Sequence, residues 1–142
     1  MHPYPHHYRT HAVGGPEQPI TVSGEGLPDL ETGPPPAFDG PPGYWSPESM
    51  LSAAVANCFI LTFRALSRHA GLAWSALSVD VDGTLEKTAD GLRFTRFDIR
   101  ATLTAAGADA ATAAELMQKA EKHCLISRSL NAQVHLEAAV VA

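Results

Sequence analysis

The chain has 142 residues, of which 45% are hydrophobic and 18% charged, with a formal net charge of −5. This length is typical of one domain, and the composition excludes a disordered or a membrane-embedded protein. The acidic balance, without a dense run of Lys and Arg, argues against a nucleic-acid partner. Because no stretch resembles a signal peptide or a run of about 18 apolar residues, no membrane association and a cytoplasmic location are expected.

All eleven prolines fall within the first 47 residues, which divides the chain into two regions inside a single predicted domain, residues 1–142. Residues 1–46 are rich in Pro and Gly. Two short extended pieces, residues 8–13 and 20–23, are predicted to pair as a hairpin across GGPEQP. The proline-rich run after Gly24 is predicted to be an irregular loop.

Residues 47–142 are predicted to begin with a long helix. Ser46 is placed as the N-cap, Pro47 as the first helical residue, and Gly71 as the stop. The helix is apolar on nearly every side between Met50 and Ala65. A helix of this kind has to be buried, and a small domain cannot surround one alone. We therefore expect a sheet on one side of the helix and a second subunit on the other.

Alternating apolar residues after the helix predict a β-hairpin that turns at TADG, residues 88–91. The apolar parity switches between Phe94 and Phe97, which predicts a β-bulge there. A second helix follows, capped by Asp109 or by a capping box from Thr112 to Glu115, and a last strand ends the chain. The predicted fold class is α+β, with an antiparallel sheet, a long buried central helix and a second helix.

The two cysteines are the main candidates for chemistry. Cys58 lies among apolar residues in the middle of the long helix, where a buried packing role is the simplest interpretation. Cys124 lies in a polar setting, and the free N–H groups of a short helix beginning after it would favour a thiolate. Packing, a metal site, a structural disulfide and a reactive thiol all remain open from these residues alone.

Other polar residues give weaker signals. Glu48 in the first helical turn is most simply a partner of the helix dipole. It precedes Cys58 by ten residues, roughly 15 Å along one helix, so the two side chains cannot meet within that helix. The four N-terminal histidines favour a solvated tail over a metal site, and no histidine is assigned as a ligand: His2, His6, His7 and His11.

With WSPESMLSAAVANCFILTFRAL and AEKHCLISRSLNAQV, the chain resembles the OsmC/Ohr family of osmotically inducible and organic-hydroperoxide-resistance proteins. The shared features are a Pro-Glu helix start, a Cys-Phe pair ten residues later, and a second cysteine followed three places on by a serine. Here these are Pro47–Glu48, Cys58–Phe59, and Cys124 with Ser127. The resemblance covers the chain from about residue 8 to the C-terminus.

The resemblance implies an intertwined homodimer whose two long helices cross at the centre, with active sites at the subunit interface. It implies that Cys58 attacks an organic hydroperoxide and that Cys124 resolves the sulfenic acid as a disulfide. A dithiol such as a lipoylated protein would then reduce the disulfide. Glu48 would orient an activating arginine, and no cofactor is implied. Apolar walls around Cys58 are expected from Phe59 and Leu61, and from three aromatic residues of the proline-rich loop: Phe38, Tyr44 and Trp45.

Two positions depart from the family pattern. Peroxidase members have the activating arginine near the first hairpin, where this chain has GGPEQPI. Leu125 replaces the proline expected after the second cysteine. The candidate substitutes for the arginine are a residue of the partner chain or one of four arginines of this chain: Arg9, Arg93, Arg96 and Arg128. The alternatives to a peroxidase are a non-catalytic dimer that binds a small apolar ligand and a structural Cys58–Cys124 disulfide without turnover.

Overall fold

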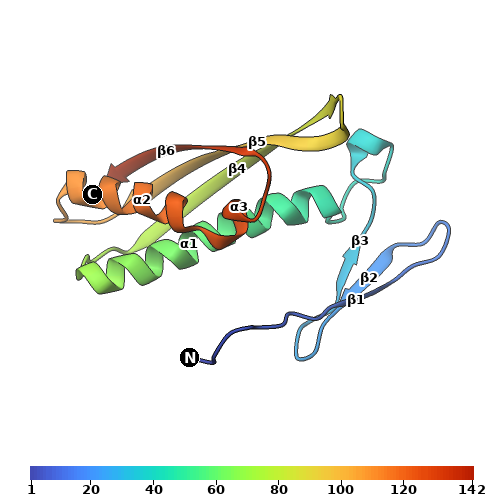
Figure 1. The fold of residues 1–142 in the computed structure, drawn as a ribbon, viewed down its shortest axis with the longest axis horizontal. Coiled ribbons are helices and arrows are strands. Elements are labelled where there is room, and N and C mark those ends of the chain that lie inside the picture. Colours follow the sequence, from blue (N-terminus) through green and yellow to red (C-terminus); the bar gives the residue numbers. More distant parts are fainter. The chain divides into compact units, whose positions relative to one another are not determined.

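The computed structural model describes all residues from 1 to 142, and the chain forms two compact units (Figure 1). The first unit is Met1–Met50 and the second is Leu51–Ala142. Each unit is described by itself. The single-domain organisation stays a prediction.

The first unit contains a small antiparallel sheet in the order β1-β2-β3. Its strands are β1 (His11–Val13), β2 (Ile20–Ser23) and β3 (Leu30–Thr32). β1 and β2 form the predicted hairpin across GGPEQP, although β1 is shorter than expected.

The irregular loop predicted after Gly24 is wrong in part, because it contains β3 and a short 3-10 helix, η1 (Pro36–Phe38). β3 pairs with β2, and Thr32 also forms a bridge to Trp45. Asp39 ends η1 in the left-handed conformation, with φ of 60°. The surrounding glycines and prolines concealed a strand of only three residues, since such residues usually mark loops.

The long helix is α1 (Pro47–Ala70), and both of its ends match the predictions. The Ser46 hydroxyl accepts a hydrogen bond from the backbone N–H of Ser49 at 3.1 Å, which satisfies one free amide of the first turn. Gly71 follows the last residue with φ of 69°, a conformation that favours glycine.

The second unit contains a three-stranded sheet in the order β4-β5-β6. Its strands are β4 (Ala76–Thr88), β5 (Gly91–Thr104) and β6 (Gln133–Val141). β4 and β5 form the predicted antiparallel hairpin, but β6 runs parallel to β5. The prediction of an antiparallel sheet is therefore wrong for β6, because the chain crosses over through the helices before it re-enters the sheet.

The predicted bulge in β5 is confirmed. Thr84 pairs with Arg96 while Leu85 pairs with Phe94, so Thr95 is the extra residue. The Phe94 and Phe97 rings consequently stack, with centroids 5.2 Å apart. Without the extra residue, two side chains three positions apart would point to opposite faces of the sheet.

Between β5 and β6 lie α2 (Ala110–His123) and α3 (Leu125–Arg128). The Asp109 carboxylate accepts a hydrogen bond from the Thr112 backbone N–H at 3.1 Å and a second from its hydroxyl at 2.6 Å. These bonds hold the pKa of Asp109 below its usual value. Of the two predicted caps, Asp109 is thus the one that forms.

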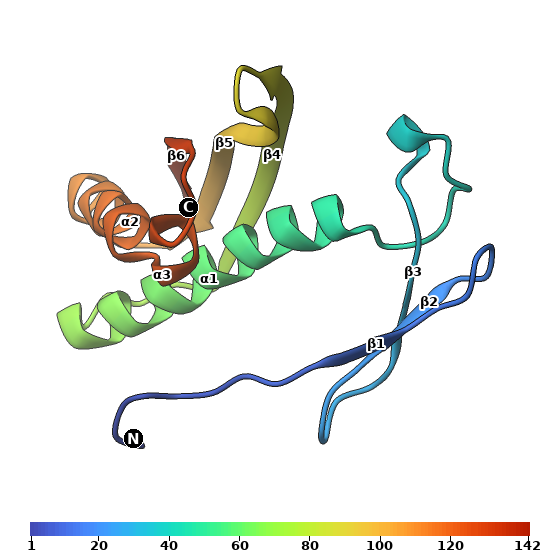
Figure 2. The same cartoon turned by 45° about the vertical axis from the view of Figure 1, so that its right-hand side comes forward.

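Two helices, α1 and α2, lie on the same side of the sheet in the second unit (Figure 2). Phe59 and Phe63 of α1 and Met117 of α2 are fully buried with the inner face of β5. α1 is long and apolar enough to cross a membrane by length and composition. Its aromatic side chains nevertheless belong to this core, so it is a core helix here.

The single chain buries only one stripe of α1. The buried residues are Val55, Cys58, Phe59, Phe63 and Ser67. On the other side Asn57 and Ala65 are exposed, and Leu61 keeps 50% of its accessible surface. The sheet therefore covers one side of the helix, as predicted, while a large apolar side chain on the opposite side is uncovered within the chain.

Candidate functional site

Cys58 lies near the middle of α1 on the buried stripe, with 9% of its surface accessible. The helical spacing places it one turn after Val55 and beside Phe59, both of which have no accessible surface. Its sulfur lies 3.9 Å from the Thr62 hydroxyl, four residues further along the helix. The thiol thus occupies an apolar environment with a hydroxyl at its side.

Cys124 lies at the junction of two helices, as the C-cap of α2 and the N-cap of α3. It has no accessible surface, and the Ser127 hydroxyl donates a hydrogen bond to its carbonyl at 3.2 Å. The short helix expected after Cys124 is therefore present. The polar neighbours in the sequence, Lys122 and His123, are exposed and lie on the last turn of α2.

The fold brings the two cysteines together, although they are 66 positions apart in the sequence. Burial raises the pKa of the Cys124 thiol, while Ser127 opposes that shift through its hydroxyl and its backbone N–H. The neighbouring Cys58 thiol raises the pKa of Cys124 further. Both cysteines are free thiols in the structure, so the pair is adjacent and reduced.

Glu48 lies in the first turn of α1, ten residues before Cys58, in a half-buried position. Its Oε2 atom is buried and has no hydrogen-bond partner in the chain. A buried carboxylate oxygen without a partner is costly, since a buried charge is normally paired or hydrogen-bonded. Oε2 can therefore accept a hydrogen bond from a further donor.

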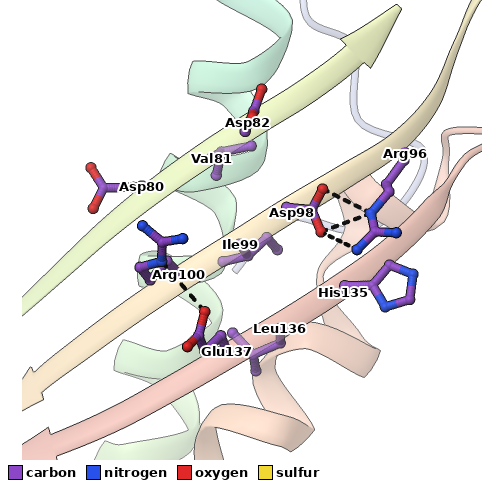
Figure 3. Close-up of a pocket in the computed structure, with 10 residues that line it drawn as sticks. All are labelled: Asp80, Val81, Asp82, Arg96, Asp98, Ile99, Arg100, His135, Leu136 and Glu137. Atoms are coloured by element: carbon purple, nitrogen blue, oxygen red, sulfur yellow. Dashed lines mark hydrogen bonds and ion pairs between the residues drawn. The ribbon is translucent and has the colours of Figure 1, made fainter.

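One of the proposed activating arginines can be assigned elsewhere. Arg96 forms an ion pair with Asp98 at 2.7 Å on the outer face of the sheet, away from α1 (Figure 3). The hydrogen bond from Arg96 holds the pKa of Asp98 below its usual value. Arg96 as the activator of Cys58 is therefore wrong, because odd-numbered residues of β5 here face the helices and even-numbered ones face away.

The other arginines have different surroundings. Arg93 donates a hydrogen bond to the backbone carbonyl of Asn131, two residues before β6 begins. Arg128 is exposed at the end of α3, four residues after Cys124. Arg9 belongs to the first unit, before β1. These three stay candidates for the activating cation.

A cavity of about 290 Å³ opens in the second unit beside the stacked Phe94 and Phe97. Its remaining lining comes from α1, β5 and the segment before β6: Leu51, Arg93, Leu130, Asn131 and Ala132. Leu51 precedes Cys58 by seven residues, two turns along the same side of α1. The cavity is therefore an apolar recess with a guanidinium among its lining residues.

Phe59 and Leu61, which were expected to form apolar walls, do not line this cavity. Phe59 is fully buried in the core, because its position on α1 faces the sheet. Leu61 faces away from the sheet and is half exposed. The structure instead offers Leu51, Phe94 and Phe97. The bulge at Thr95, which aligns the two phenylalanines, was the sequence signal for them.

The N-terminal histidines do not converge on a common point. His6 Nε2 lies 2.9 Å from the carbonyl oxygen of His2, and its ring stacks on Tyr4 with centroids 4.5 Å apart. No group of three or more His, Cys, Asp or Glu side chains in the chain is arranged to hold a metal ion.

Thr62 is the polar neighbour of Cys58 that the sequence analysis treated only as part of the apolar helix. The signal that would have found it is the spacing of four residues, which places two side chains next to each other on one helical face. The same logic identifies Ser127, three residues after Cys124. Each cysteine thus has a hydroxyl neighbour from its own helical segment, Thr62 at the Cys58 sulfur and Ser127 at the Cys124 carbonyl.

The sequence and the fold can be compared with known proteins. The chain is 32% identical to the uncharacterized protein YmaD of Bacillus subtilis over 112 residues, 75% of each chain. It is 29% identical to peroxiredoxin OsmC of Escherichia coli over 100 residues, which are 70% of this chain and 69% of that protein.

Solved structures agree in fold. An OsmC-like protein of unknown function from Vibrio cholerae superposes with a TM-score of 0.85 at 16% identity, covering 94% of this chain and 99% of the other. An organic hydroperoxide resistance protein from Elizabethkingia anophelis gives 0.82 at 20% identity, covering 97% and 99%. At these identities the match shows the α+β fold alone.

The family model described as OsmC-like protein matches residues 40–139, from before the helix start to the last strand. That range contains the Pro47–Glu48 helix start and both neighbouring thiols. By this match and by its fold, the chain belongs to the OsmC-like protein family.

Proposed function

We propose that the chain is a thiol-dependent peroxidase that reduces organic hydroperoxides to alcohols. The observation that supports this most is the meeting of Cys58 and Cys124 in a reduced pair. Two thiols that the fold brings together from distant segments can cycle between dithiol and disulfide. The family contains proteins named peroxiredoxin OsmC and organic hydroperoxide resistance protein, which fits this chemistry.

In the proposed first step, the Cys58 thiolate attacks the terminal oxygen of the hydroperoxide. A sulfur–oxygen bond forms, the O–O bond breaks, and the alkoxide leaves and takes up a proton to become the alcohol. Cys58 is oxidised to the sulfenic acid, and the peroxide is reduced by two electrons.

In the second step, the Cys124 sulfur attacks the sulfenic sulfur of Cys58. The disulfide forms, the S–O bond breaks, and hydroxide leaves as water with the proton of the Cys124 thiol. The raised pKa of Cys124 keeps that proton on the sulfur near neutral pH, so the proton is available at this step. An external dithiol, which we propose to be a lipoyl group on a protein, returns both cysteines to thiols and becomes a cyclic disulfide.

The role proposed for Glu48 is to orient a cation that stabilises the Cys58 thiolate. Its buried Oε2 atom without a partner supports this role, because a guanidinium would satisfy it. Arg93 or Arg128 of this chain, Arg9, or an arginine of a second subunit would supply the charge.

We propose that the protein is a cytoplasmic homodimer in which the second copy covers the exposed side of α1. Half of the Leu61 surface is accessible in the single chain, on a helix that is apolar nearly all round. Light scattering with size-exclusion chromatography should give about twice the mass of one chain. Leu61→Glu should shift the mass toward the monomer, and a monomeric wild-type protein would reject the dimer.

The proposed substrate is an organic hydroperoxide with an apolar tail. The cavity beside Phe94 and Phe97 lies along the same side of α1 as Cys58, and its walls suit a greasy group better than hydrogen peroxide. Peroxide consumption should be measured with cumene hydroperoxide and with hydrogen peroxide, using dihydrolipoamide or dithiothreitol as the reductant. The organic peroxide should be consumed faster.

Two variants make the peroxidase test decisive. Cys58→Ser should abolish turnover because it removes the attacking sulfur. Cys124→Ser should still consume about one equivalent of peroxide per chain, since the first step needs only Cys58. Turnover by the wild-type protein no higher than the Cys58→Ser background would reject the proposal.

A second candidate is a non-catalytic dimer that binds a small apolar ligand. The observation that favours it is the lack of a basic residue in the segment 14–20, where peroxidase members are expected to have the activating arginine. This candidate predicts that a fluorescent apolar probe binds with equal affinity to the wild-type and Cys58→Ser proteins, and that neither consumes peroxide.

A further inference from the structure

The Thr62 hydroxyl lies beside the Cys58 sulfur. It lies four residues further along α1, so the two side chains are neighbours on one face of the helix. Its Oγ1 atom is 3.9 Å from Cys58 Sγ, within hydrogen-bonding range for sulfur, and Thr62 makes no second side-chain hydrogen bond. The threonine is half-buried, and Cys58 is buried.

The direction of this hydroxyl is informative. A threonine inside a helix commonly donates back to the carbonyl four residues earlier, which here is that of Cys58. In this chain Thr62 instead faces the sulfur of the same residue. A hydroxyl can rotate so that it donates to a thiolate or accepts from a thiol, and donation to the charged form favours that form.

Other groups considered for the stabilisation of the Cys58 thiolate do not supply a donor, which makes the contact with Thr62 more important. Arg96 is held by Asp98 on the outer face of the sheet, so it cannot stabilise negative charge at Cys58 (Figure 3). Val55 and Phe59, next to Cys58 on the helix, contribute no polar group. Thr62 is therefore the donor that α1 itself supplies to the thiolate.

We propose that Thr62 is a hydrogen-bond donor that stabilises the Cys58 thiolate and fixes the position of its sulfur. Thr62 supplies part of the stabilisation for which peroxidase members of the family use an arginine. Its role in turnover rests on the proposed peroxidase function. Its effect on the Cys58 thiolate does not, and it can be measured without any peroxide.

The test compares Thr62→Val, which removes the hydroxyl and keeps the shape, with Thr62→Ser, which keeps the hydroxyl. The rate of alkylation of Cys58 by iodoacetamide is followed from pH 5 to 10 on the full-length protein, with mass spectrometry resolving the two cysteine peptides. Thr62→Val should slow alkylation of Cys58 about three- to tenfold at pH 7, the equivalent of one hydrogen bond. The difference should vanish at high pH, where every thiol is ionised.

Two internal controls separate a hydrogen bond from a structural effect. Thr62→Ser should alkylate within about twofold of wild type, since one hydroxyl replaces the other. The circular-dichroism spectrum of both variants should match that of wild type. Equal Cys58 profiles for wild type and Thr62→Val would overturn the assignment, and so would slowing by the same factor at every pH, because lost access to the thiol does not depend on ionisation.

The failure of this inference can be told from failure of the peroxidase proposal. If wild type consumes no peroxide but the Thr62→Val profile shifts as expected, the donor assignment stands and the peroxidase proposal falls. If peroxide is consumed through Cys58 while the alkylation profiles coincide, the peroxidase stands and Thr62 is only a packing residue.

Discussion

Replacing Gly83 by alanine should loosen the contact between α1 and the sheet. Gly83 lies on the face of β4 that points to the helices. A Cβ atom built there would lie 2.8 Å from Ser52 Oγ, 2.9 Å from Phe97 Cε1 and 3.1 Å from Phe94 Cε1. Distances below 3.0 Å force a neighbour to move. The Ser52 hydroxyl can rotate away, but the Phe97 ring is fully buried and packed in the core.

The expected size follows from two opposing effects. Overpacking of this kind costs about 1–3 kcal/mol, while replacing a glycine recovers about 0.4–1 kcal/mol through the unfolded chain. The net loss in the free energy of unfolding should be about 1–2 kcal/mol. The phenylalanines also line the cavity beside α1, so Gly83→Ala should also lower turnover of bulky hydroperoxides more than turnover of hydrogen peroxide.

Urea unfolding followed by circular dichroism provides the measurement, with Gly15→Ala as the matched control. A Cβ at Gly15 meets no atom within 4 Å, so that variant should be within about 0.5 kcal/mol of wild type or slightly more stable. In the double variant Gly83→Ala with Ser52→Ala, only part of the loss should be recovered, since the contact with Phe97 remains. A Gly83→Ala protein as stable as wild type would refute the reasoning.

Three further predictions concern stability. The pKa of the Cys124 thiol is raised in the folded state, so its contribution to the free energy of unfolding is fully present below the unfolded pKa of about 8.5 and is lost as pH rises through the folded pKa. Cys124→Ala should therefore weaken the loss of stability that urea titrations show between about pH 7 and pH 10. Ser46→Ala should lower the unfolding free energy by about 1 kcal/mol, because Ser49 N–H loses its cap; Ser46→Asp should restore it. Trp74→Phe removes the 2.8 Å bond to the buried Ser67 hydroxyl and should cost about 1 kcal/mol in thermal unfolding.

Features set by local chemistry were predictable from the sequence. The cap at Ser46, the glycine at position 71 and the carboxylate at Asp109 each satisfy backbone groups within a few residues, so a short window contains the whole cause. The bulge at Thr95 was equally visible, since a change in apolar parity is the direct consequence of one extra residue.

Features set by long-range pairing were not predictable in the same way. Whether β6 runs parallel or antiparallel to β5 depends on the path of the crossover through α2 and α3, and its alternating residues look the same in either direction. β3 was missed because its three residues owe their conformation to pairing with β2 rather than to their own preferences.

In the candidate site, too, local features were predictable from the sequence and long-range ones were not. The two cysteines were identified from the sequence, but their adjacency depends on how the crossover returns Cys124 to the buried side of α1. The sequence also made Arg96 look equivalent to Arg93, because it does not show where the pairing between β5 and β6 begins. Arg96 lies where β6 pairs with β5 and forms an ion pair with Asp98, whereas Arg93 lies beyond that pairing and donates to Asn131 beside the cavity.

The position of Arg96 on the outer face leaves the stabilisation of the Cys58 thiolate to other groups. A cation is the usual means of lowering the cost of a buried thiolate, and the second unit directs Arg96 away from the helix. A hydroxyl one helical turn away requires no long-range pairing, because the spacing between Cys58 and Thr62 is fixed by α1 itself. The donor to Cys58 is therefore formed as soon as the helix is, while Glu48, with its buried oxygen unpaired, is the group that still requires a partner.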